Sequence, residues 1–146
     1  MKLKQLSVFL ENKPGALSAP CRRLAQAGIN LLTLCLADTR EFGILRLVVR
    51  DWEKARQTLE AGGWAVRLTD IVAVEVPDQP GGLADLLEVF ERAGINVEYM
   101  YAFSVKAEDR GLLVFRFDDP EAAVAALREA KVSVVDEVEL FRRLEA

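Results

Sequence analysis

The stretch Asn12-Lys13-Pro14-Gly15-Ala16-Leu17 recurs 66 residues later as Asp78-Gln79-Pro80-Gly81-Gly82-Leu83. At the same spacing, Ala27-Gly28-Ile29-Asn30 recurs as Ala93-Gly94-Ile95-Asn96. Further along, the spacing becomes 68 and pairs Asp51 with Asp119 and Ala55 with Ala123. A constant spacing of this length marks repeated structural units, so the 146-residue chain is a duplication. We expect one unit over residues 1–69 and the second over residues 70–146, with almost no linker between them.

Both units show the same order of predicted elements. Apolar residues alternate over residues 6–10 and 71–76, which indicates a strand with one apolar face. A Pro-Gly turn and a helix follow each strand, and then come two strands, a second helix and a last strand. Asp51 and Asp119 are suited to cap the second helices. The order βαββαβ predicts an α+β fold of two tandem ferredoxin-like units, with antiparallel sheets and helices on one face.

Composition narrows the classes of function. The chain has no histidine, which excludes Ser-His-Asp and Cys-His catalysis and histidine metal sites. Its two cysteines form no CxxC pair, so we expect free thiols in a reducing compartment and no metal or other cofactor. The net charge of −4 and the lack of a basic cluster argue against nucleic acid. No apolar run approaches the ~20 residues that span a bilayer, and we expect a cytoplasmic protein that binds no membrane.

The predicted third strand of each unit indicates an assembly. Leu45 and Leu47 alternate with Ile44 and Val48, so both faces of the strand are largely apolar. Helices cover only one of these faces, and a large apolar patch usually marks an interface. We therefore expect a homodimer, and we expect Val114→Asp, in the second copy of this strand, to break it.

The repeated motifs resemble the ACT domain family. Each copy has Gly-Ile-Asn thirteen residues after the Pro-Gly glycine, inside a βαββαβ order. The resemblance covers nearly the whole chain and is closest to stand-alone tandem ACT proteins without a catalytic domain. It implies a non-catalytic, allosteric regulatory module of amino-acid metabolism that binds a free amino acid. In this family the ligand lies where the first strand-to-helix turn of one unit faces a neighbouring unit.

The resemblance also implies the binding residues. In the first unit they are Asn12, Lys13, Pro14, Gly15, Ala16, Leu17, Asn30 and Leu31. In the second unit they are Asp78, Gln79, Pro80, Gly81, Gly82, Leu83, Asn96 and Val97. A turn glycine permits close backbone approach, and a helix N-terminus favours a carboxylate. Ionised Asp78 repels a carboxylate where Asn12 can donate to it, so we expect the two sites to be inequivalent.

Other interpretations fit parts of the same pattern. The Pro-Gly turns and the later glycines also suit purely structural turns and helix caps. Trp52 and Trp64 flank the second helix and are interpreted as packing residues. A regulatory subunit that binds a partner biosynthetic enzyme is the main alternative, and a small ferredoxin-like enzyme is the third. No residue in either motif selects a particular side chain, so the identity of the amino acid stays open.

Overall fold

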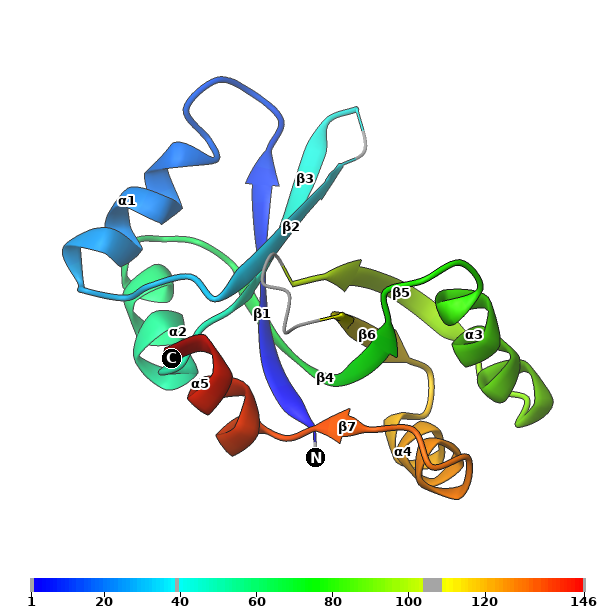
Figure 1. Ribbon diagram of the computed structural model, residues 1–146. Coiled ribbons are helices and arrows are strands. Elements are labelled where there is room, and N and C mark those ends of the chain that lie inside the picture. Colours follow the sequence, from blue (N-terminus) through cyan, green and yellow to red (C-terminus); the bar gives the residue numbers. More distant parts are fainter. Residues whose placement is uncertain (1, 39, 104–108, 146) are drawn as a thin grey trace. The chain divides into compact units, whose positions relative to one another are not determined.

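The computed structural model describes residues 2–38, 40–103 and 109–145 (Figure 1). The chain divides into two compact units. The N-terminal unit contains residues 4–69, and the C-terminal unit contains the residues from Asp70 onward together with Lys2 and Leu3. The division falls inside strand β4 (Val66–Pro77), so no separate linker segment joins the units. Each unit is described below by itself.

The N-terminal unit contains five elements, of which β1 lacks only its first residue there, and the start of β4. They are β1 (Leu3–Glu11), α1 (Ser18–Gln26), β2 (Thr33–Asp38), β3 (Phe42–Val48) and α2 (Trp52–Ala61). Strand β3 pairs antiparallel with both β1 and β2, and Val8 lies opposite Leu45. The Phe9 N–H donates to the Ala65 carbonyl at 3.2 Å, which holds the start of β4 beside β1.

The core of the N-terminal unit lies between one face of this sheet and the two helices. Leu6 and Val8 of β1 pack with Leu24 of α1 and Leu59 of α2, and all four are fully or almost fully buried. Helix α2 begins where expected, because the Asp51 side chain accepts the Lys54 N–H at 3.1 Å. Leu6, Val8 and Leu10 alternate along β1 and point into this core, which explains the apolar alternation seen in the sequence.

The C-terminal unit repeats the arrangement and adds a helix. Its elements after β4 are α3 (Gly82–Arg92), β5 (Val97–Ala102), β6 (Arg110–Phe117), α4 (Pro120–Glu129), β7 (Val134–Val135) and α5 (Glu137–Glu145). Strand β6 lies between β4 and β5, β7 pairs with β4, and all these pairings are antiparallel. Phe90 of α3 packs edge-on against Phe117 of β6, with ring centroids 4.7 Å apart. The expected α+β fold of two ferredoxin-like units is confirmed.

Helix α5 is tied to the sheet face that α3 and α4 leave open. Glu75 points to this face, because its neighbours Val74 and Val76 belong to the core on the other side. Arg143 of α5 donates to Glu75, and Arg110 Nη1 lies 3.7 Å from the second carboxylate oxygen of Glu75. Val114 on the same face has no exposed surface. The expectation that Val114 lies in the interface of a homodimer is therefore wrong, because Val114 is already buried within a single chain.

Candidate ligand site

The turn between β1 and α1 forms the centre of the candidate site. Gly15 has φ +85°, a left-handed conformation that favours glycine, and this reverses the chain before the helix. The Ala16 N–H donates to the Lys13 carbonyl at 3.2 Å, and the Ala19 N–H donates to the Gly15 carbonyl at 3.2 Å. In Figure 1 the turn is the blue loop above the end of β1. These two hydrogen bonds fix the position at which α1 starts.

The first two residues of this turn are held by their neighbours. The Asn12 N–H donates to the Glu41 carbonyl at 3.0 Å, and Asn12 Nδ2 donates to the Arg40 carbonyl at 3.4 Å. Lys13 Nζ lies 2.8 Å from Glu11 Oε2. This ion pair lowers the pKa of Glu11 and raises the pKa of Lys13, mainly through the hydrogen bond between them. The side-chain amide of Asn12 is thus held to the neighbouring loop by a long hydrogen bond.

A cavity of about 280 Å³ lies beside this turn. Its lining residues are Phe9, Leu10, Glu11, Lys13, Ala16, Ala19 and Trp64. Of the residues predicted from the sequence, Lys13 and Ala16 line it. The others, including the exposed Asn12, Pro14 and Leu17, do not.

Trp64 was not predicted as a site residue, because it is far from the turn in the sequence. The bond from the Phe9 N–H to the Ala65 carbonyl brings it there by pairing the start of β4 with β1. Its ring lies directly over Gly62. A Cβ added to Gly62 would come within 2.4 Å of Trp64 Cζ3. The interpretation of Trp64 as a packing residue is thus incomplete, since the same side chain also forms a cavity wall.

Asn30 and Leu31 lie at the other end of α1. The helix has nine residues and spans about 13 Å, and the turn precedes it whereas Asn30 follows it (Figure 1). Gly28, with φ +74°, reverses the chain after the helix. Asn30 is exposed and Leu31 is half-buried. One unit therefore does not bring Asn12 and Asn30 together around a single amino acid.

The corresponding turn of the C-terminal unit has the same backbone. Gly81 has φ +86°, and the Gly82 N–H donates to the Gln79 carbonyl at 3.1 Å. The Asp78 N–H donates to the Asp109 carbonyl at 2.8 Å. Exposed Leu83 follows, as Leu17 does in the first turn, and Pro80 is also exposed.

The two turns differ in the space beside them. A Cβ added to Gly82 would lie 2.3 Å from the Pro77 carbonyl oxygen. Helix α3 therefore starts in direct contact with the end of β4. Ala16, which occupies the equivalent position in the N-terminal unit, carries a Cβ and lines the cavity. We call the C-terminal turn closed, because its first helical position admits no Cβ, and the N-terminal turn open, because Ala16 has a Cβ there and lines the cavity.

The remaining predicted residues of the C-terminal unit join its strands. The Asn96 N–H donates to Asp118 Oδ1 at 3.2 Å, and the Asp118 N–H donates to the Asn96 carbonyl at 3.3 Å. Val97 lies opposite Phe117 in the sheet. Both residues therefore have a clear structural role, as the asparagine after α3 ties β5 to the end of β6.

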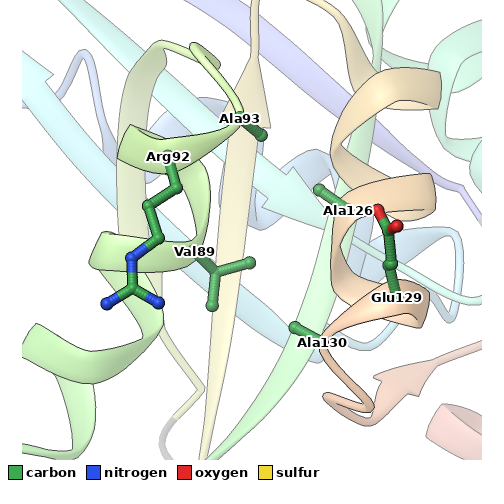
Figure 2. Close-up of a pocket in the computed structure, with 6 residues that line it drawn as sticks. All are labelled: Val89, Arg92, Ala93, Ala126, Glu129 and Ala130. Atoms are coloured by element: carbon green, nitrogen blue, oxygen red, sulfur yellow. The ribbon is translucent and has the colours of Figure 1, made fainter.

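A second cavity, in the C-terminal unit, lies away from all predicted site residues. It has a volume of about 420 Å³ and lies between α3 and α4, as Figure 2 shows. Alanines and Val89 form its walls, and Arg92 at its edge pairs with Glu88 at 3.2 Å. Across residues 2–38, 40–103 and 109–145, no three metal-binding side chains gather in one place. In the same residues no helix is long and apolar enough to cross a membrane.

Comparison with known proteins identifies relatives of the whole chain. A family model described as an ACT domain pair matches residues 1–144. A crystal structure of protein BT0572 from Bacteroides thetaiotaomicron is 38% identical, with 97% of this chain and 96% of that chain covered and a TM-score of 0.90. The regulatory subunit of aspartate kinase from Thermus thermophilus is 20% identical over 87% of this chain and 91% of that chain, with a TM-score of 0.63.

The likeness to the regulatory subunit of aspartate kinase shows a shared fold only, because the two sequences are only 20% identical. No curated protein matches the chain. The family model, in contrast, extends over both units, and the resemblance seen in the two Pro-Gly turns is confirmed. The chain belongs to the ACT domain pair family.

Proposed function

We propose that this protein is a non-catalytic regulatory sensor that binds a free amino acid beside the β1–α1 turn of its N-terminal unit. The observation that carries the proposal is the cavity at this turn, whose lining combines one cation and one anion with an apolar wall. Membership of the ACT domain pair family supports it, since the family's ligands are held at this turn. The two free cysteines agree with a reducing cytoplasmic location.

The charges at the cavity complement a zwitterion. The Lys13 ammonium is placed to attract a carboxylate, and the Glu11 carboxylate is placed to attract an ammonium. A ligand would exchange the internal ion pair for two pairs of its own. Both side chains are mostly exposed, so this exchange needs little desolvation. The Asn12 amide, at the start of the same turn, is of a type that can donate to the ligand carboxylate.

We also propose a homodimer in which Asn30 of a second copy approaches the ligand. Asn30 of the same unit lies beyond the far end of α1 and cannot do so. The N-terminal unit exposes Phe9 and Phe42 on the sheet face opposite its helices, at 44% and 58% of their surface. The strand register places Phe9 and Phe42 on the same face, since Phe9 lies opposite Ile44 and Glu11 lies opposite Phe42. Exposed apolar side chains on one face are typical of an interface between copies.

A thermal-shift screen of the twenty amino acids tests the ligand class. An amino acid that binds the folded protein raises the unfolding midpoint. Calorimetry with the strongest hit should then show that Lys13→Met abolishes measurable binding. The matched variant Gln79→Met, at the equivalent position of the C-terminal unit, should leave the affinity unchanged. If no amino acid raises the midpoint, the proposed function is wrong.

Sedimentation tests the assembly. The protein should sediment as a dimer at micromolar concentration, and Phe42→Asp should convert it to a monomer. Val138→Asp on α5 is the control, because Val138 is 78% exposed but belongs to the C-terminal unit. Asn30→Ala should leave the dimer intact and weaken ligand binding by about 10- to 150-fold, the loss of one hydrogen bond to a charged group. A monomeric wild-type protein would contradict the dimer.

A further inference from the structure

We propose that the groove between α3 and α4 is a second contact surface between copies of this chain, in which α3 of one copy packs on α4 of the other. The inference goes beyond the proposed function, because the groove lies in the C-terminal unit and contains none of the residues of the proposed amino-acid site. It is drawn from the apolar lining of the groove, from the charges on its two sides, and from the residues that replace both in the N-terminal unit.

Small apolar side chains line the groove. Val89 and Ala93 of α3 face Ala126 and Ala130 of α4, as Figure 2 shows. Val89 and Ala126 are half-buried, whereas Ala93 and Ala130 are exposed. Helices approach one another most closely where the side chains at the contact are small. The groove, with a volume of about 420 Å³, therefore has room for side chains of an incoming helix.

Helix α4 is apolar on its outer side as well as on its core side. The run Ala122–Leu127 contains only alanine, valine and leucine. Ala123 and Leu127 are fully buried in the core, whereas Ala125 is exposed and Ala126 is half-buried. A helix that is apolar all round is typical of one that is covered on both sides. We therefore expect the outer side of α4 to meet a further helix or strand.

The equivalent helix of the N-terminal unit keeps the core positions and changes the others. Ala55 and Leu59 of α2 are buried like their counterparts in α4. The remaining four positions of the run are occupied in α2 by Lys54, Arg56, Gln57 and Thr58. Arg56 forms an ion pair there with Glu60 at 2.8 Å. The core is built from the same two residue types in both units, so it does not explain the apolar outer side of α4.

Two opposite charges flank the groove. Arg92 lies on the α3 side and Glu129 on the α4 side, at about the same level along the groove in Figure 2. A two-fold axis along the groove places α3 of one copy on α4 of the other, and so brings each Arg92 toward Glu129 of the second copy. The surface is thus complementary to itself in charge, which indicates a second copy as the occupant. In the N-terminal unit these positions are taken by Gln26 and Ala61, which carry no charge.

The size of the surface determines the strength of the contact. Helices of eleven and ten residues, such as α3 and α4, span about 15 Å each. Two such helices side by side, each about 10 Å wide, offer about 300 Å² in projection. A standard stable interface buries about 800 Å² on each partner. The contact should therefore be weak, and the dimer proposed for the N-terminal unit should associate further only as the concentration approaches the millimolar range.

Sedimentation over a range of concentrations tests the contact surface. The average mass of the wild-type protein should rise above that of the dimer between micromolar and millimolar concentration, and Phe42→Asp should rise from monomer to dimer. Ala126→Arg places a long charged side chain in the groove and should abolish the rise. Thr58→Arg, the same change at the equivalent position of α2, should leave the rise unchanged. Amino-acid binding by Ala126→Arg should equal that of the wild type, so this test is separate from that of the proposed function.

An exchange of the two charges tests the proposed geometry. Arg92→Glu and Glu129→Arg should each weaken the self-association about 10-fold, because each change turns two ion pairs between copies into repulsions. The double variant Arg92→Glu/Glu129→Arg has opposite charges again and should associate as the wild type does. Thermal unfolding of each variant confirms that it is folded during sedimentation.

Two kinds of result would overturn the inference. If the wild-type mass does not rise with concentration, or rises equally in Ala126→Arg, the groove is not a contact surface. If the double charge variant associates no better than the two single variants, α3 of one copy does not pack on α4 of the other.

Discussion

The two Pro-Gly turns share a backbone but not the space beside it. Gly15 and Gly81 have φ values of +85° and +86°, and both are followed by the same pattern of turn hydrogen bonds. At the next position, however, Ala16 borders a cavity, whereas Gly82 leaves no room for a Cβ against the Pro77 carbonyl. The open turn therefore has a Cβ at its first helical position, in Ala16, and the closed turn has none, in Gly82.

This difference teaches that a repeated motif need not repeat its function. In the N-terminal unit the turn carries the Glu11–Lys13 ion pair, and Trp64 forms a wall. In the C-terminal unit the positions of Glu11 and Lys13 are taken by Pro77 and Gln79, which carry no charge. We interpret the second turn as structural, since it anchors α3 to the end of β4.

The largest expected loss of stability comes from adding a Cβ at Gly82 in the closed turn. Gly82→Ala should destabilise the protein by about 3 kcal/mol, because the new Cβ meets backbone that cannot move aside. The reverse change in the other unit, Ala16→Gly, should cost no more than about 1 kcal/mol, through chain entropy alone. Denaturant unfolding measures both. Equal losses in the two variants would contradict the comparison.

An exchange of Asn12 and Asp78 sharpens the comparison at the level of binding. Asn12→Asp should weaken the binding of the amino acid by about 1.5–3 kcal/mol. The reason is that an ionised carboxylate at this position cannot donate a hydrogen bond and repels the ligand carboxylate. Asp78→Asn should create no second site, since Pro77 and Gln79 stand where Glu11 and Lys13 stand and supply no charges for a zwitterion. Calorimetry of both variants measures this. Unchanged affinity in Asn12→Asp would remove Asn12 from the site.

The turn glycines test whether the two backbones are truly equivalent. Gly15→Ala and Gly81→Ala should each cost about 1–2 kcal/mol, because both residues are left-handed and neither Cβ would meet an atom within 4 Å. Thermal unfolding should show the same loss for the two variants within error. A much larger loss for one of them would mean that the turns differ in backbone strain as well as in space.

The smallest effect is a pH dependence confined to the open turn. The pKa of Glu11 is lowered by Lys13, so the stabilisation is present above the ordinary value of 4.5 and is lost as pH falls below it. The pKa of Lys13 is raised, so the same stabilisation is also lost as pH rises above 10.5. The difference in unfolding midpoint between wild type and Lys13→Met should disappear at both extremes. Gln79→Met should show no such dependence.

Much of the fold could be predicted from the sequence, because the same strand and helix-cap patterns occur in both units. The alternating residues of β1 and β4 and the caps at Asp51 and Asp119 are visible in the sequence, and the structure confirms them. The charged segment from Glu137 to Arg143 is also typical of a C-terminal helix, but the contact of α5 with the sheet and the burial of Val114 could not be found in this way. The face that α5 reaches depends on the contact of Arg143 with Glu75, which are 68 residues apart.

The candidate site was only partly predictable. Lys13 and Ala16 belong to the motif, and both line the cavity. Trp64 reaches the cavity through the pairing of β1 with the start of β4, for which the motif contains no signal. Replacement of Ala16 by Gly82 looks conservative in the sequence. Its meaning depends on the distance to the Pro77 carbonyl, and only the structure gives that distance.

The stoichiometry of amino-acid binding tests the central claim most directly. In a calorimetric titration of the wild-type protein with the strongest amino acid from the screen, the account predicts one ligand bound per chain. That binding should disappear in Lys13→Met and persist in Gln79→Met. Two ligands bound per chain, or one ligand that survives Lys13→Met and is lost in Gln79→Met, would contradict the assignment of the site to the N-terminal unit.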